Sequence, residues 1–265
     1  MRSFDSCVAL VTGASAGLGV EFARQLAPRA RVLILVARRE ERLKELAAEI
    51  ARPGLDVRIH ALDLSDAQQL ENLITAVSGE GIDLLVNNAG VGDHGLFEKS
   101  EWSRVQAMLD TNIRALTRLT HALLPKLVQS HRGAILNVSS IAGLLPVPRS
   151  MVYAATKAYV SSFSEGLRAE LCGSGVTVTA LLPGPIDTEF FIRAERPGAV
   201  SGVINSGFFK IPAWQAVHEA LVAAERGRAR VISGWRVWAL MTIAALVPIA
   251  LLRLALPIAA NRRRG

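Results

Sequence analysis

Through the first 185 residues, short runs of β-branched and aliphatic residues alternate with longer segments of helical periodicity. The expected helices are 17–28, 40–52, 66–78, 101–129 and 151–172, with Pro125 expected to kink the fourth. The expected strands are 7–12, 31–37, 57–62, 82–86, 134–138 and 176–182. Strands that alternate with helices form βαβ units with right-handed crossovers. The pattern therefore predicts the α/β class and a parallel sheet.

The regular alternation ends at Pro183. Residues 183–212 hold four glycines, four prolines and four phenylalanines without a stable period, which is typical of a lid or a binding loop. A helix over 213–226 and a strand over 230–233 are expected to follow. We expect residues 1–234 to form a single domain and residues 235–265 to form an apolar C-terminal tail flanked by arginines.

The net charge of +7 is concentrated at the C-terminal end of the chain. Eight arginines and no acidic residue follow position 225, so residues 1–225 carry a net charge of −1. A nearly neutral body does not favour nucleic-acid binding. The two cysteines are too few for a disulfide framework or a cysteine-rich metal site, and we expect no bound metal.

A glycine-rich turn, TGASAGLG at residues 12–19, joins the first expected strand to the first helix. Glycines at such a turn allow backbone N–H groups to approach a pyrophosphate at the helix N-terminus. The spacing G-x-x-x-G-x-G differs from the usual dinucleotide fingerprint, G-x-G-x-x-G. An ordinary tight turn between a strand and a helix is the alternative.

The second expected strand ends at Ala37 and is followed by Arg38 and Arg39, where a carboxylate would bind a ribose 2′-hydroxyl. A guanidinium can bind a 2′-phosphate through two hydrogen bonds, so these arginines favour NADP(H), with NAD(H) as the second choice. The alternative is that both arginines are solvated at a helix start and pair with Glu40 and Glu41.

Two further strand ends carry candidate cofactor contacts. Asp63 and Leu64 follow the third strand. The carboxylate could accept a hydrogen bond from an adenine amino group or cap the next helix, although Ser65 is the better-placed cap. The sequence NNAG at residues 87–90 follows the fourth strand and lets the chain run close beside a flat cofactor. Taken alone, that sequence indicates only a turn.

Tyr153 and Lys157 lie four residues apart in an expected helix and should share one face. A nearby ammonium lowers the pKa of a phenol, which makes Tyr153 a candidate proton donor or acceptor. Ser140 ends the fifth strand, and its hydroxyl could bond a substrate carbonyl oxygen. The alternatives are solvated side chains for the pair and, for Ser140, a plain strand end shared with Ser139.

Together these motifs resemble the short-chain dehydrogenase/reductase family in its common branch. The resemblance covers residues 7–232 and rests on TGASAGLG, Asp63, NNAG, Asn112, Ser140, YAATK at 153–157 and PGPIDT at 183–188. It implies a Rossmann-like, doubly wound, mostly seven-stranded parallel sheet with helices on both faces. It also implies hydride transfer between a nicotinamide cofactor and a carbonyl or alcohol.

The resemblance implies a role for each matching residue. Tyr153 would be the general acid/base, Lys157 would lower its pKa and hold the nicotinamide ribose, and Ser140 would orient the substrate oxygen. Asn112 would fix a water that links Lys157 to solvent. The other cofactor-binding residues would be Gly13, Ser15, Gly17, Leu18, Gly19, Arg38, Arg39, Asp63, Leu64, Asn88, Ala89, Gly90, Pro183, Gly184 and Thr188. Family members commonly pair two long helices across subunits, so a homodimer or homotetramer is expected.

The C-terminal tail departs from the family pattern. Residues 237–252 are uncharged, Arg253 interrupts the apolar run, and Trp235 and Trp238 stand at its start. The run is shorter than the roughly 20 residues of a spanning helix, so contact with a membrane interface is favoured. Packing on the body or on another subunit is one alternative. The other is a true membrane span that bridges Arg253. No apolar stretch precedes the first strand, so we expect no signal peptide and a cytoplasmic protein that is membrane-associated through 235–265.

The phenylalanine-rich loop and the apolar tail together favour a lipophilic substrate. The leading hypothesis is an NADP(H)-dependent oxidoreductase that reduces a lipophilic ketone to a secondary alcohol. The first alternative is a soluble dehydrogenase of small 3-hydroxy acids or sugars whose tail forms an oligomer interface, because apolar lids also exclude water from small substrates. The second is a sensor that binds NADP(H) without turnover.

Overall fold

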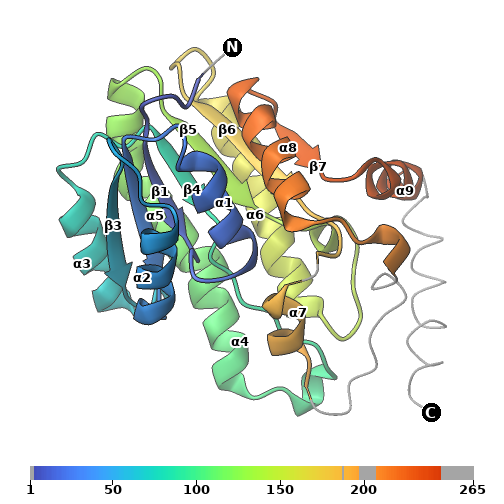
Figure 1. Ribbon diagram of the computed structural model, residues 1–265. Helices are drawn as coiled ribbons and strands as arrows, with labels where there is room; N and C mark the ends of the chain where they lie inside the picture. The colour runs from blue at the N-terminus through green and yellow to red at the C-terminus, as the bar shows by residue number, and fades with distance from the viewer. Residues whose placement is uncertain (1–2, 187, 197–206, 246–265) are drawn as a thin grey trace.

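The computed structural model describes residues 3–186, 188–196 and 207–245 (Figure 1). Its centre is a seven-stranded sheet of order β3-β2-β1-β4-β5-β6-β7, in which every pair is parallel. The strands are β1 (Val8–Thr12), β2 (Val32–Ala37), β3 (Asp56–Ala61), β4 (Leu84–Asn87), β5 (Ala134–Val138), β6 (Thr177–Leu182) and β7 (Arg230–Ile232). The fold class expected from the sequence is confirmed.

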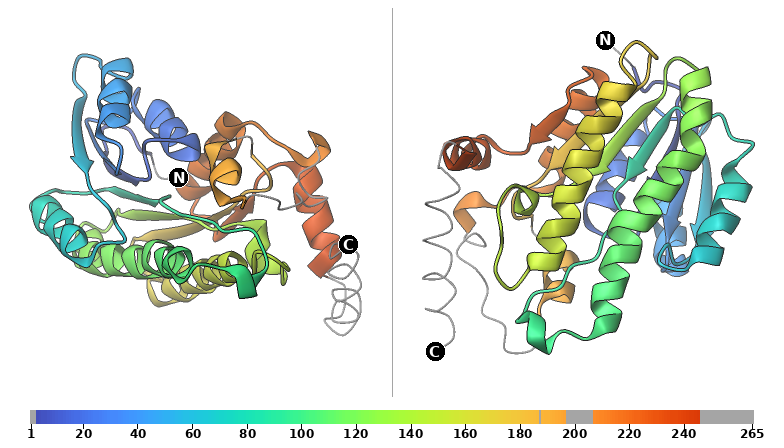
Figure 2. Two further views of the ribbon diagram at one scale, coloured as in Figure 1. Left: turned by 90° about the horizontal axis from the view of Figure 1, so that it is seen from below. Right: turned by 180° about the vertical axis from the view of Figure 1, so that it is seen from behind.

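Helices cover both faces of the sheet, and the two layers are seen end-on in Figure 2. One face carries α1 (Gly17–Leu26), α2 (Glu40–Glu49) and α8 (Ala213–Glu225). The other carries α3 (Ala67–Val77), α5 (Leu116–Gln129) and α6 (Met151–Glu170). The central strands are continuous apolar runs because both of their faces are buried, whereas edge strand β3 alternates polar and apolar residues.

The expected helix 101–129 is divided in the structure. It consists of α4 (Trp102–Leu109), a π-helical segment over Asp110–Ala115, and α5, which continues through Pro125. The wider π turn carries Asn112, whose side chain is buried. Such turns are frequent at functional sites, and nothing in the hydrophobic period indicated this one.

The cap of α3 also differs from the expectation. The Asp66 carboxylate accepts hydrogen bonds from the backbone N–H groups of Gln68 and Gln69, at 2.8 and 3.0 Å. Ser65 instead donates to Asp63. The helix therefore begins one residue later than expected, which leaves the Asp63 carboxylate at the strand end.

The segment expected to be a loop contains regular structure. A short helix, α7 (Glu189–Ala194), and a 3-10 turn over Gly207–Phe209 lie within the described residues of 183–212. After β7 the chain forms α9 (Trp235–Ala245), which buries Val237 and Met241 against the end of β6. No helix in the described ranges is long and apolar enough to cross a membrane. Most of the expected tail, 246–265, lies outside them.

Candidate active site

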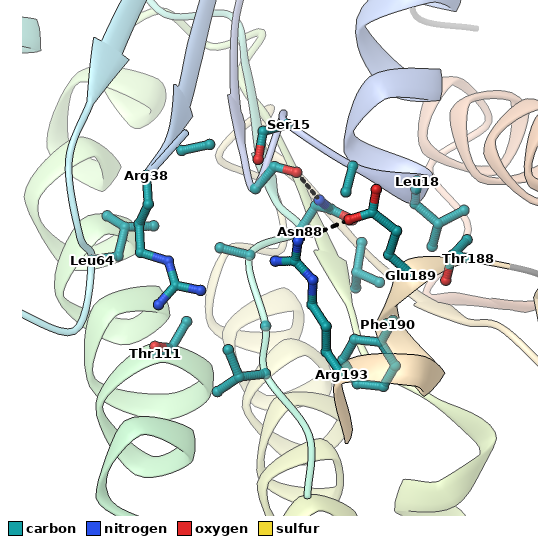
Figure 3. Close-up of a pocket in the computed structure, with 18 of the residues that line it drawn as sticks. Ser15, Leu18, Arg38, Leu64, Asn88, Thr111, Thr188, Glu189, Phe190 and Arg193 are labelled. Carbon is teal, nitrogen blue, oxygen red and sulfur yellow. Dashed lines mark hydrogen bonds and ion pairs between the residues drawn. The ribbon is translucent and has the colours of Figure 1, made fainter. Parts of the chain in front are cut away.

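A pocket lies at the carboxyl ends of the central strands, between the sheet and α7 (Figure 3). Parallel α/β sheets bind ligands at this edge. Fifteen of the residues proposed from the sequence line it: Gly13, Ser15, Gly17, Leu18, Arg38, Arg39, Asp63, Leu64, Asn88, Ala89, Gly90, Tyr153, Lys157, Pro183 and Thr188. Gly19, Asn112, Ser140 and Gly184 are not among the lining residues.

The glycine-rich turn and the NNAG segment form one tightly packed unit. Gly13 has a φ of +68°, and a Cβ added there would lie 2.8 Å from Asn88 Nδ2 and 2.9 Å from Ala89 Cα. Asn88 donates from Nδ2 to the Thr12 carbonyl at 2.9 Å, and its backbone N–H donates to Thr12 Oγ1 at 3.0 Å. Side chains are excluded here, so the backbone can approach a diphosphate closely.

Gly19 has a packing role under this turn instead of lining the pocket. A Cβ there would lie 2.1 Å from the Gly13 carbonyl oxygen, so the first turn of α1 can approach the loop only without a side chain. Gly184 likewise serves packing, because a Cβ there would lie 2.9 Å from Val237 of α9. This contact could not be read from the sequence around Gly184.

The two arginines after β2 have different surroundings. Arg38 is 58% exposed, forms an ion pair with Asp63 at 3.6 Å and extends toward Thr111 in Figure 3. Arg39 donates to the Ser15 carbonyl at 2.8 Å and to Glu189 at 3.0 Å. Both therefore turn toward the pocket.

The two glutamates that could have formed ion pairs with these arginines pair with a lysine instead. Glu40 and Glu41 both pair with Lys44, each at 3.0 Å. Asp63, the partner of Arg38, is held ionised. Burial acts to raise the pKa of Asp63, but hydrogen bonds from Ser65 and the nearby guanidinium outweigh it and hold the pKa below its ordinary value.

Tyr153 and Lys157, four residues apart on α6, both line the pocket. Burial raises the pKa of Tyr153 to about 12, against a smaller lowering by its hydrogen bond with Ser140. Lys157 is buried, and its Nζ donates to the Val138 carbonyl at 2.8 Å and lies 5.8 Å from the centroid of the Tyr153 ring. Burial lowers the pKa of Lys157 to about 8.

The expected lowering of the Tyr153 pKa is therefore not found. The ammonium of Lys157 donates to a backbone carbonyl. Loss of solvent around the phenol raises the pKa of Tyr153, and only the hydrogen bond with Ser140 acts against it. The sequence spacing placed the two groups on one face correctly, but the pKa depends on how deeply that face is buried.

Asn112 lies directly behind the NNAG segment. Its Oδ1 accepts from the backbone N–H of Val91, and its Nδ2 donates to the Val91 carbonyl, both at 2.9 Å. Nδ2 also donates to Thr156 of α6 at 3.0 Å. A Cβ on Gly90 would lie 3.4 Å from Asn112 Oδ1 and 3.3 Å from Lys157 Nζ, so Gly90 leaves these groups close to each other.

The lid side of the pocket is formed by α7 and the residue before it. The Phe190 ring lies 5.4 Å from that of Tyr153, and Gly92 leaves space for it. Sequence reasoning missed Thr111, Glu189 and Arg193 as lining residues. The spacing of Glu189 and Arg193, four residues apart, was the one available signal of a helix turn in this loop.

Comparisons with known proteins agree with this fold. The family model for short chain dehydrogenases matches residues 7–197. Sulfoacetaldehyde reductase 2 of Chromohalobacter salexigens is 41% identical, with 70% of this chain and 75% of that protein aligned. The NADP-dependent 3-hydroxy acid dehydrogenase of Escherichia coli is 38% identical, with 69% and 74% aligned. A short-chain dehydrogenase from Sphingobium yanoikuyae, solved with NADPH, is 33% identical with a TM-score of 0.81 over 94% of both chains.

Proposed function

Because the chain belongs to the short-chain dehydrogenase/reductase family of oxidoreductases, we propose that it interconverts a carbonyl and a secondary alcohol with NADP(H). The observation that carries the proposal is the placement of Tyr153, bonded to Ser140 and beside Lys157, in a pocket that two arginines also line.

The residues of the pocket fit a dinucleotide phosphate. The backbone around Gly13, closed to any side chain, fits a diphosphate at the start of α1. Arg38 and Arg39 would lie beside the 2′-phosphate of the adenosine ribose, and Arg39 also donates from Nε to Ser15 Oγ of the turn at 3.2 Å. The nicotinamide supplies or accepts the hydride when the cofactor is bound.

The protein contributes the proton and the orientation of the substrate. A phenol whose pKa lies at about 12 keeps its proton at neutral pH, so Tyr153 is suited to protonate the substrate oxygen during reduction. The Ser140 hydroxyl, beside Tyr153, can donate to the same oxygen. Lys157 Nζ and Asn112 Oδ1 both lie next to Gly90, within 3.4 Å of where a Cβ would stand, so they are placed to hold the ribose and a water that returns the proton to Tyr153.

A lipophilic ketone is the proposed substrate. Phe190 packs on Tyr153, and Leu144 and Met151 are exposed apolar residues on the segments that flank Ser140 and Tyr153. A small hydroxy acid or short aldehyde is the second candidate, because relatives about 40% identical are named for such substrates.

The test is NADPH oxidation by the full chain against carbonyls graded from short 3-oxo acids and small aldehydes to long-chain and steroidal ketones. A rate that increases with chain length or ring count supports the lipophilic substrate. Activity confined to small polar carbonyls supports the second candidate. Binding of NADPH without oxidation against any carbonyl contradicts the proposed reaction.

We also propose that α9 touches a membrane surface, in keeping with the apolar sequence that follows it. Trp235, Trp238 and Ile243 are 74%, 55% and 64% exposed, and the Arg236 guanidinium lies 4.5 Å from the Phe208 ring. Co-sedimentation with anionic lipid vesicles should decrease when Trp235 and Trp238 are both changed to serine. An unchanged vesicle-bound fraction, with loss of a defined oligomer, would instead assign these residues to a subunit interface.

A further inference from the structure

The Glu189 carboxylate is shared by two arginines from opposite sides of the pocket. Arg39, which follows β2, donates to Glu189 Oε2 at 3.0 Å. Arg193, one helical turn further along α7, reaches the same oxygen at 3.0 Å. All three side chains line the pocket, and Figure 3 shows Arg193 rising from the lid toward Glu189.

Glu189 lies in front of the N-terminus of α1. The preceding residue, Thr188, touches Gly17, since a Cβ on that glycine would lie 3.1 Å from Thr188 Cγ2. Figure 3 places the Glu189 carboxylate beside Leu18, over the glycine-rich turn. This is the end of α1 at which backbone N–H groups and the helix dipole favour an anion.

The charges around Glu189 match those of an anion site. The hydrogen bond from Arg39 and the charges of Arg39 and Arg193 hold the pKa of Glu189 below its ordinary value, so it is ionised at neutral pH. A diphosphate bound at the same helix end would meet this negative charge. The two anions would compete for the N-terminus of α1 and for the Arg193 guanidinium.

We propose that Glu189 is an internal counter-ion that a cofactor diphosphate displaces, and that Arg193 then binds the diphosphate from the lid. The inference rests on the proposed function for the presence of a nicotinamide dinucleotide. It adds to that function an arginine of α7 that binds the cofactor and a carboxylate that opposes cofactor binding.

The C-terminal end of α7 is held by contacts that do not involve the Glu189 side chain. The backbone N–H of His94 donates to the Ala194 carbonyl at 2.8 Å, and Arg196 forms an ion pair with buried Asp93. Glu189 and Arg193, in contrast, are about half exposed. Side-chain rotation at Glu189 can therefore release both arginines while the helix stays in place.

The test is titration of NADPH and of NADH into Glu189→Gln, Arg193→Gln and the double variant, followed by nucleotide fluorescence without a carbonyl substrate. We expect Glu189→Gln to tighten both nucleotides about threefold to tenfold, because repulsion is removed while the side-chain size is kept. Arg193→Gln should weaken both about tenfold, also in the Glu189→Gln background, because a charge-assisted contact to phosphate is lost.

Arg42→Gln is the matched control. Arg42 is close enough to influence the charge of Glu189, but it pairs with Glu45 and does not line the pocket. Its affinities should stay within about twofold of the wild type, since it meets no phosphate. Circular dichroism and Tm show that each variant is folded.

Three results would overturn the inference while leaving the proposed function intact. The first is weaker binding by Glu189→Gln. The second is an Arg193→Gln effect that disappears in the Glu189→Gln background, which would mean that Arg193 only neutralises Glu189. The third is an Arg193→Gln loss confined to NADPH, which would place Arg193 at the 2′-phosphate. A wild type that binds neither nucleotide contradicts the proposed function as well.

Discussion

The two sides of the pocket are held by different kinds of interaction. On the sheet side, Asn88 is bonded to the backbone of β1, and Thr12 and Lys157 are only 2% and 4% exposed. On the lid side, the contacts to Glu189 are ion pairs between groups that are open to solvent. Around Asn88 and Lys157 the sheet side is therefore held by backbone and buried hydrogen bonds, whereas the contacts to Glu189 on the lid side are exchangeable charges.

The sheet side of the pocket is therefore rigid, and the lid side is the part that a ligand can change. A buried backbone contact cannot be changed without moving a strand, so the sheet side presents the same shape to every cofactor. Ion pairs in solvent contribute roughly 0–1 kcal/mol each, and a charged ligand can replace them at little cost. A ligand is expected to alter the lid and leave the sheet side unchanged.

The largest expected effect is chemical and lies on the sheet side. Tyr153→Phe removes the proton donor while keeping the ring against Phe190. We expect kcat/KM for carbonyl reduction to fall by about 10²–10⁴-fold. The Kd for NADPH, measured by fluorescence, should stay within about twofold, since the phenol hydroxyl lies away from the phosphates. Retained turnover would remove Tyr153 from proton transfer.

The next largest effect is expected from a substitution that disrupts the backbone packing of the glycine-rich turn. Gly19→Ala places a Cβ 2.1 Å from a backbone oxygen, so we expect the free energy of unfolding to fall by about 3 kcal/mol. Gly166→Ala is the control, because a Cβ there meets nothing within 4 Å and α6 should gain about 0.5–1 kcal/mol. Urea unfolding measures both. Equal changes would mean that the turn is less rigid than the contacts indicate.

A smaller loss of stability is expected at the ion pair that follows α7 and attaches it to the rest of the protein. Arg196→Met leaves the Asp93 carboxylate, 5% exposed, with Arg104 at 3.3 Å as a second partner. We expect a loss of about 1–2 kcal/mol, less than for a buried charge left without any partner. Hydrogen exchange at the amides of His94 and Gly95 should accelerate about tenfold. Arg24→Met, which breaks an exposed pair with Glu49, is the control and should leave these amides unchanged.

The smallest expected effect is a pH dependence of the free energy of unfolding, which arises from Lys157 on the sheet side of the pocket. Burial lowers the pKa of Lys157 to about 8, below its ordinary value of 10.5. Between these values the unfolded chain binds a proton that the folded chain does not, so this group makes stability rise with pH. The free energy of unfolding of the wild type minus that of Lys157→Met should therefore increase from pH 8 to pH 10. Parallel pH profiles would show that Lys157 is not desolvated.

The sequence predicted the sheet side well because its signals are local. The strand runs, the closed turn at Gly13 and the four-residue spacing of Tyr153 and Lys157 each depend on neighbours in the chain, and the structure brings these residues to one pocket. The fold class and the family are confirmed. Gly19 and Gly184 do not line the pocket: a Cβ on Gly19 would meet the Gly13 carbonyl of the same turn, and a Cβ on Gly184 would meet Val237 of α9, a contact that no local pattern identifies.

The sequence by itself determined the α/β class, the order of strands and helices, and the positions of the candidate cofactor and proton-transfer groups. Only the tertiary structure decided the raised pKa of Tyr153, the π turn at Asn112 and the carboxylate of Glu189 between two arginines. Periodicity and motif spacing are properties of consecutive residues. The burial of Tyr153 and the ion pair between Arg39 and Glu189 depend on groups far apart in the chain, and they form only once the sheet and the lid are packed together.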